Sequence, residues 1–199
     1  MRKLFFVVGL LLLASGVARA ACDNYQPVEV GFGYDYVRVN TGMTVKGGTG
    51  GSSATLPALN LNGWGAEVVY NPACVLGIVA DFGGTYGTTS LTFGSTDPNL
   101  TTHVYSYVFG PRLNLRNATP FTPFAEALFG GAHVNLSVPN LGSETLNGFE
   151  GNFGGGVDIN LGSHWAIRPR ADYVLTHFKS KSQNNALVSV GIAYEFGRH

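Results

Sequence analysis

The segment at residues 184–196 alternates between two kinds of side chain, and this alternation constrains the fold more than any other feature. Successive side chains of a β-strand point to opposite faces, so a period of two predicts a strand. One face would carry Val188, Val190, Ile192, Tyr194 and Phe196, and the other Leu187, Ser189, Gly191, Ala193 and Glu195. An apolar outer face and a small or charged inner face suit the wall of a transmembrane barrel, with lipid outside and a polar lumen inside.

Seven further segments show the same period of two. They run over residues 28–40, 59–71, 75–88, 101–116, 121–135, 147–161 and 164–178. Each exceeds the roughly 9–11 residues that a tilted strand needs to cross a bilayer. The sequence therefore predicts an all-β fold, an eight-stranded antiparallel up-and-down transmembrane β-barrel.

The connections between these segments alternate in length. Those at 71–74, 117–120 and 161–164 are tight. The longer ones lie at residues 41–58, 89–100, 136–146 and 179–183. Short periplasmic turns and longer external loops are typical of outer-membrane barrels, which predicts both termini in the periplasm and four loops outside. The first of these loops is long and rich in Gly and Ser, and is the best candidate for contact with an external ligand or surface.

The first twenty residues predict an export signal. Two positive residues precede an apolar stretch at 4–14, and a small–x–small motif follows at 18–20. This arrangement is typical of a cleaved secretory signal peptide. We expect a signal at 1–20 and a barrel domain at 21–199.

The chain contains two cysteines, Cys22 and Cys74. Exported compartments permit disulfides, and the two positions meet at one barrel end if the first two strands pair antiparallel. A Cys22–Cys74 disulfide is therefore a possible bridge, and two free thiols are the alternative. Lipidation of Cys22 is disfavoured, because Arg19 stands where a lipidation motif has an aliphatic residue.

The alternation places most charged residues of the strands on the inner face. The predicted luminal charge network consists of Glu29, Asp35, Glu67, Asp81, Arg112, Glu126, Asp158, Arg168, Arg170, Asp172 and Glu195. An arginine on the lipid face near the midplane would cost about 2–4 kcal/mol. Eight strands leave a narrow interior, so we expect a plug of salt bridges, hydrogen bonds and trapped water. Inward glycines such as Gly31, Gly65 and Gly154 are expected to make room for the arginines.

The chain resembles the OmpA-type outer-membrane β-barrel domain family, as found in small stand-alone eight-stranded bacterial outer-membrane proteins. The residues that carry the resemblance are the segments 62–66 (NGWGA), 81–84 (DFGG), 109–112 (FGPR) and 123–131 (PFAEALFGG), together with the closing strand. The resemblance implies the barrel fold and the bacterial outer membrane as its location.

The closing strand also resembles the C-terminal assembly signal of these barrels, through Ser189, Gly191, Tyr194 and Phe196. The resemblance implies the barrel-insertion machinery as a partner during assembly. The tail at residues 197–199 departs from the pattern, because the signal usually ends on its aromatic residue.

Little in the sequence indicates catalysis. The chain has equal numbers of acidic and basic residues, so no nucleic-acid partner is expected. No motif for a cofactor or a metal is present. His177 and Ser180 lie near one predicted external rim and His103 near another, but a nucleophile also needs a base held by a third group. We expect no enzymatic activity.

The sequence thus favours a non-enzymatic outer-membrane barrel with a structural role in the envelope and loops available for surface interaction. Its expected partners are outer-membrane lipid, the insertion machinery and an unknown external ligand or surface. A narrow porin-like pore and a lipid-modifying enzyme are the alternatives. A soluble lipocalin-like barrel is a further alternative at the level of the fold, and it would need an apolar lumen.

Overall fold

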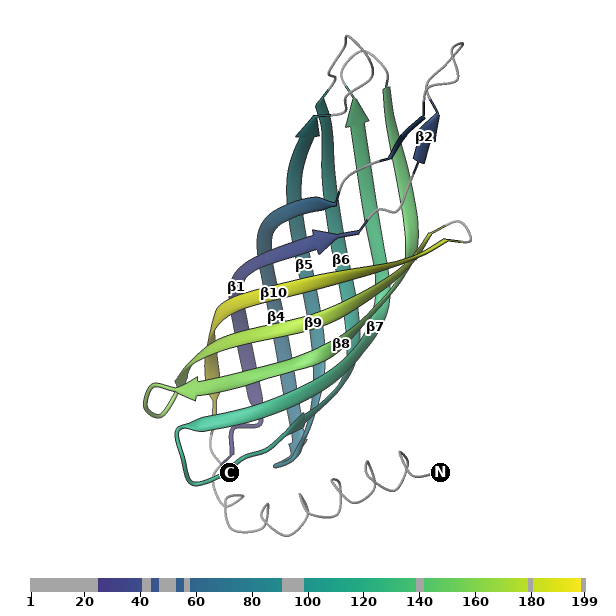
Figure 1. Ribbon diagram of the computed structural model, residues 1–199. Coiled ribbons are helices and arrows are strands. Elements are labelled where there is room, and N and C mark those ends of the chain that lie inside the picture. The colour runs from purple at the N-terminus through teal and green to yellow at the C-terminus, as the bar shows by residue number, and fades with distance from the viewer. Residues whose placement is uncertain are drawn as a thin grey trace, which may run out of the picture.

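Eight long strands form a closed barrel in the computed structural model, which describes residues 25–40, 44–46, 53–55, 58–90, 99–138, 142–178 and 181–197 (Figure 1). The strands are β1 (Val28–Val39), β4 (Leu59–Ala73), β5 (Leu76–Ser90), β6 (Asn99–Asn114), β7 (Phe121–Val138), β8 (Gly142–Asn160), β9 (Trp165–Phe178) and β10 (Lys181–Phe196). Their order round the barrel is β1-β10-β9-β8-β7-β6-β5-β4. The predicted fold class is confirmed.

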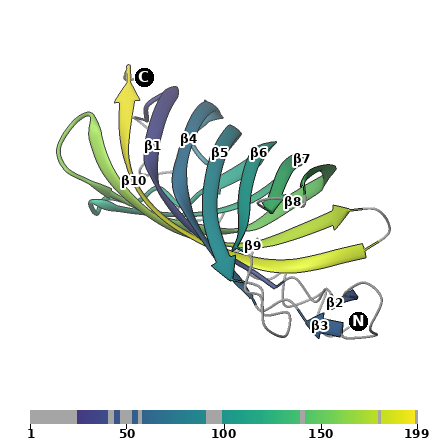
Figure 2. The ribbon, with the colours of Figure 1, turned by 90° about the horizontal axis from the view of Figure 1, so that it is seen from above.

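Every strand pairs antiparallel with both neighbours, and β10 closes the barrel on β1. Val28 faces Phe196 at one end of this seam and Val39 faces Asn185 at the other. The strands at the front of Figure 1 cross those at the back at a steep angle, and Figure 2 shows the same tilt from above. Closure of a sheet requires such a tilt, and it leaves no strand edge unpaired.

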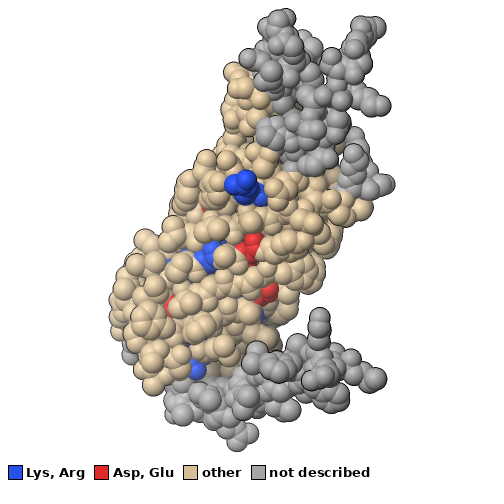
Figure 3. Space-filling model, viewed as in Figure 1, with Lys and Arg blue, Asp and Glu red and all other residues tan. Residues whose placement is uncertain are grey.

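The period of two sorts side chains between the outside and the lumen as the sequence predicts. Large apolar side chains outside are exposed, with Phe32 at 64%, Ile192 at 57% and Leu113 at 46% of their full exposure. Aromatic rings pack beside one another there, for example Phe82 against Phe109 at 5.7 Å between centroids. Charged atoms are sparse on the face in Figure 3. Such an exterior is matched to lipid rather than to water.

The three short connections lie at the end of the barrel that also holds the C-terminus (Figure 1). In the turn between β8 and β9, Gly162 has φ +107°, a conformation that residues with a Cβ rarely adopt. The β4–β5 turn comes two residues later than predicted. The strand continues through a register shift between Tyr70 and Ala73, and Cys74 and Val75 form the turn.

The opposite end differs from the prediction in two respects. The first predicted loop contains two short paired strands, β2 (Thr44–Lys46) and β3 (Ser53–Thr55). The predicted long loop at 136–146 is mostly strand, since β7 and β8 continue their ladder to the pair Val138 and Gly142. Backbone pairing does not require apolar side chains, so the ladder extends through polar residues beyond the lipid-facing part.

No helix in the described part of the chain is long and apolar enough to cross a membrane.

Candidate functional site

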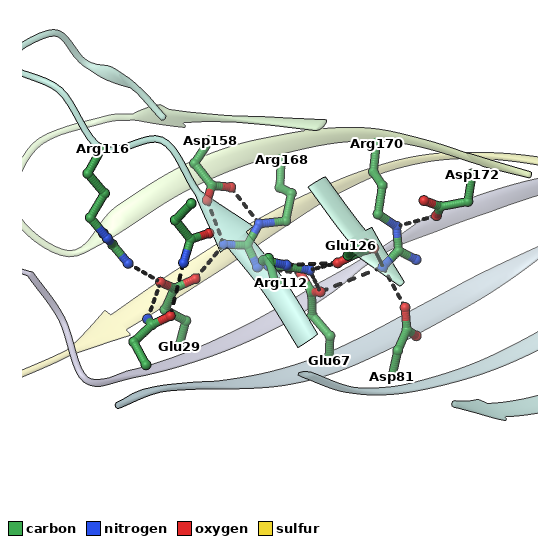
Figure 4. Close-up of polar contacts among 12 residues, drawn as sticks. Glu29, Glu67, Asp81, Arg112, Arg116, Glu126, Asp158, Arg168, Arg170 and Asp172 are labelled. Atoms are coloured by element: carbon green, nitrogen blue, oxygen red, sulfur yellow. Dashed lines mark hydrogen bonds and ion pairs between the residues drawn. The ribbon is translucent and has the colours of Figure 1, made fainter. Parts of the chain in front are cut away.

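The lumen holds nearly all the charged side chains of the barrel strands. All eleven residues predicted for the luminal network are buried there, each with at most 8% of its surface exposed. Nine of them, joined by Arg116, form one connected set of ion pairs across the barrel (Figure 4). The narrow bore explains this connection, because side chains from opposite walls of an eight-stranded barrel are within contact distance.

Arg168 on β9 joins three strands. Its Nε donates to Asp158 Oδ1 at 2.5 Å and its Nη2 to Asp158 Oδ2 at 2.8 Å, so that the planar guanidinium grips one carboxylate with two bonds. Nη1 donates to Glu67 and Nη2 also to Glu29, each at 2.5 Å. Glu29 in turn accepts from Arg116 at 3.0 Å. These contacts lie in the half of the lumen nearer the short turns, which the sequence predicts to be the periplasmic half.

Arg112 and Arg170 continue the network toward the middle of the barrel. Arg112 is fully buried and donates to Glu67 at 2.6 Å and to Glu126 at 2.8 Å. Arg170 pairs with Asp81 at 2.5 Å and with Asp172 at 3.0 Å. Each guanidinium therefore has at least two acidic partners, as a buried cation requires if it is to stay charged.

An aromatic ring lies among these charges. Phe124 shares the inner face of β7 with Glu126 and Leu128, as the period of two requires once Glu126 points inward. The Cζ atom of Arg112 lies 4.2 Å from its ring centroid and that of Arg168 lies 5.5 Å away. A guanidinium over an aromatic face is attracted by the ring quadrupole, so Phe124 holds the two arginines without a charge of its own.

The inward glycines accommodate carboxylates, and the expectation that they make room for arginines is wrong at three positions. A Cβ on Gly31 would lie 2.9 Å from Glu67, and one on Gly65 would lie 2.6 Å from Asp35. A Cβ on Gly154 would meet Asp172. The physical reason is reach: short acidic side chains stay close to the wall, whereas arginines extend into the bore.

Two predicted residues lie in the lumen without an ion pair among the described residues, namely Asp35 and Glu195. Two further charged residues were not predicted for it. Arg116 reaches Glu29 from the end of β6, and Glu150 is buried on β8 with a hydrogen bond from Ser106 at 2.8 Å. Glu150 is separated from Asn152 and Asp158 by an even number of positions, so the alternation along this strand already indicated that it faces the lumen.

The external half of the lumen is lined mainly by aliphatic side chains. They include Leu59, Leu61, Val104, Val174 and Leu187, which surround a cavity of about 120 Å³. The sequence-based predictions did not include this region. Leu59 and Leu61 are separated from Glu67 by an even number of positions, so the period of two does place them on the same inward face. The lumen is therefore charged at one end and mainly apolar at the other.

Neither of the two histidines named from the sequence, His103 and His177, has an orienting acidic partner among the described residues. His177 Nδ1 lies 3.0 Å from the hydroxyl of Ser182, its cross-strand partner, whereas Ser180 falls outside the described residues. No acidic side chain of the described residues forms an ion pair with His177. His103 packs edge-on against Tyr86. These contacts lack the third group that would orient a base.

The remaining predicted sites concern cysteines, metals and the signal peptide. Cys22 lies outside the described residues, so its bridge to Cys74 stays a prediction, and the described residues contain no free cysteine. Within the described ranges, no group of three acidic, histidine or cysteine side chains could hold a metal ion. The signal at 1–20 also falls outside the described residues.

The closing strand presents its predicted assembly residues on the two faces of the wall. Tyr194 and Phe196 lie on the outer face with their ring centroids 4.6 Å apart, while Ser189 and Gly191 lie on the inner face. Their role in assembly stays a prediction.

A closed antiparallel barrel with an apolar exterior and a charged interior is an integral membrane barrel. The chain belongs to the outer membrane protein β-barrel domain family, whose sequence model matches residues 8–196. The protein is therefore an outer-membrane β-barrel protein of the bacterial envelope. A search of curated proteins found no match.

Solved structures with the same fold are small outer-membrane barrels. Neisserial surface protein A is 11% identical, with 85% of this chain and 97% of that chain covered and a TM-score of 0.60. Ail, the attachment invasion locus protein of Yersinia pestis, is 16% identical, with 86% and 99% covered and a TM-score of 0.55. OprG from Pseudomonas aeruginosa is 10% identical, with 88% and 99% covered and a TM-score of 0.53. At these identities the likeness concerns the fold alone.

Proposed function

We propose that this protein is a non-enzymatic, non-conducting barrel that supports the outer membrane and presents its external hairpins to a partner or surface. The observation that carries the proposal is the ion-pair network, which occupies the periplasmic half of the bore. An ion crossing the barrel would have to separate Arg168 from Glu29, Glu67 and Asp158. Breaking a buried pair in this way is costly.

The external presentation rests on the hairpin of β7 and β8. Phe129 and Phe149 are the last large aromatic residues on its outer face, and their rings stack at 6.5 Å. Beyond them the outer face is polar. His133 Nδ1 contacts Asn147 Oδ1 at 2.5 Å and Thr145 donates to Asn135 at 2.9 Å. Polar side chains do not suit lipid, so we infer that this part of the hairpin projects beyond the bilayer.

Conductance in a planar lipid bilayer tests whether the ion-pair network closes the lumen to ions. We expect no current steps from the wild-type barrel and steps from the Arg112→Ala/Arg168→Ala double variant, because the variant loses the two arginines that lie closest to Glu67 and keeps only the longer contact with Arg170. Arg38→Ala changes an exposed arginine of β1 and is the matched control. Equal steps from all three proteins would contradict the sealed lumen and favour the porin-like pore.

Labelling of whole cells tests the presentation. Ser143 and Ser163 are both exposed, one in the β7–β8 hairpin and the other in the short β8–β9 turn. We expect a membrane-impermeant maleimide to label Ser143→Cys but not Ser163→Cys. The reverse pattern would invert the orientation and remove the proposed surface role.

A lipid profile of the host tests the absence of catalysis. Expression of the wild type and of His177→Ala should give the same phospholipid and lipid A species. A species present only with the wild type would favour the lipid-modifying enzyme.

A further inference from the structure

The apolar half of the lumen has the composition of a small-molecule site. Leu61, Val174 and Leu187 on its wall are buried, with 1%, 4% and 9% of their surface exposed. Their inward position is unusual for a barrel in which polar residues generally face the lumen. Pockets that bind small molecules are typically apolar, with a few polar groups placed to orient the ligand.

This cavity supplies such polar groups. Asp35 and Asn152 line its floor and Thr102 lines its wall nearer the external rim, and each is at most 3% exposed. Asp35 Oδ1, Thr102 Oγ1 and Asn152 Oδ1 have no hydrogen-bond partner within the described part of the chain. Buried polar atoms in folded proteins almost always have a partner. Two such atoms on the floor of one cavity, from Asp35 and Asn152, point to a group that binds between them.

The polar groups on the floor of the cavity favour a ligand that donates hydrogen bonds. A carboxylate oxygen and an amide oxygen can only accept hydrogen bonds. Glu150 adds another carboxyl group, and no described lysine or arginine forms an ion pair with it. Arg170, which also lines the cavity, already pairs with Asp81 and Asp172. The floor therefore has an excess of acceptors and of acidic groups.

We propose that the external half of the lumen binds a small amphipathic amine. Its apolar body would lie against the aliphatic wall, and its terminal ammonium group would donate to Glu150, Asp35 and Asn152. The ion pairs below close the route to the periplasm, so the site is a blind pocket and not a passage. A bound amine needs neither conductance nor a surface partner, so this site is independent of the function proposed above.

The first measurement is a titration of the barrel in lipid nanodiscs, with its Leu and Val methyl groups labelled for NMR. The probes share an eight-carbon tail and differ in the head: n-octylamine, 1-octanol and octanoate. We expect saturable shifts at Leu61, Val174 and Leu187 with octylamine. Octanol should bind about tenfold more weakly, because it loses the charge-assisted bond, and octanoate should not bind.

Lipid-facing methyl groups provide the internal control. Val68 and Val190 are 44% and 51% exposed on the outer surface. Probe molecules that merely dissolve in the bilayer would shift these methyl groups without saturation. Equal, non-saturating shifts at Val190 and Leu61 would overturn the proposal.

Two variants separate the contribution of the aliphatic wall to binding from that of the acidic floor. Ala132→Phe places a ring in the cavity and should abolish saturable binding, while Ala171→Phe makes the same change on the exposed face of β9. Glu150→Gln should weaken octylamine about tenfold and leave octanol within about twofold. Heat-modifiable gel migration checks that each variant folds. If Ala132→Phe does not fold, Glu150→Gln decides alone, and unchanged octylamine affinity in that variant would refute the site.

Discussion

At the scale of the residue, buried ion pairs dominate the interior. Arg168 contacts carboxylates from three strands, β1, β4 and β8. Buried ion pairs add little stability compared with apolar side chains of the same size, but the loss of one partner leaves a buried charge uncompensated. The network therefore specifies how the walls face one another more than it adds to stability.

Replacing Arg168 by Met tests this interpretation. The variant keeps much of the side-chain volume and leaves Glu29, Glu67 and Asp158 with fewer cationic partners. We expect the free energy of unfolding to fall by about 3–5 kcal/mol. Urea unfolding in lipid vesicles, followed by gel mobility without boiling, measures it.

Arg38→Met is the matched control, because Arg38 is exposed on β1. Its effect should stay within about 0.5 kcal/mol. Equal effects of the two substitutions would show that the luminal pairs are energetically unimportant.

At the scale of the element, each strand has one face in contact with lipid and the other in contact with the lumen. On β10, Ile192 lies outside while Ala193 and Glu195 are buried. A shift of register by one residue would exchange these faces and place Glu195 in lipid. The alternation thus fixes the pairing of β10 with β1 and β9 as well as its conformation.

The lipid-facing side of β10 predicts a strong dependence on depth. Val190 is 51% exposed and pairs with Pro169, which lies midway between Trp165 and Tyr173 on the outer face of β9, whereas Asn184 lies near the external rim. Val190→Arg should lower the free energy of unfolding by about 2–4 kcal/mol, and Asn184→Arg by about 0–1 kcal/mol. The urea assay measures both. Similar costs at the two positions would contradict the placement of the bilayer.

At the scale of the whole molecule, closure of the barrel makes all strands depend on one another. β10 completes the hydrogen bonding of both β1 and β9. Without it, two edges would be open, which is untenable in lipid because their backbone groups would have no partner.

Removal of residues 184–199 should therefore abolish the folded form. In a Gram-negative host the full chain should fractionate with the outer membrane and change its gel mobility only on boiling. The shortened chain should show no such change. Removal of residues 197–199 alone leaves β10 intact and is the control. A boiling-dependent shift in the shortened chain would mean that seven strands suffice.

The sequence by itself determined the strands, their two faces and the class of protein. These properties depend on alternation within each segment, which is local and can be read without knowing the neighbours. The same local signal places Glu150 and Leu61 inward when it is followed to the strand ends. It also places both residues of the seam pair Glu29 and Glu195 in the lumen.

Only the tertiary structure decided which side chains meet. Arg168 and Glu67 are 101 positions apart, and their contact depends on the tilt and stagger of strands on opposite walls. The same stagger collects the aliphatic residues of seven strands at one height and the charges at another. Heights along the barrel axis follow from closure of the whole sheet. No single segment contains that information, so the division of the lumen into a charged half and an apolar half emerged only from the fold.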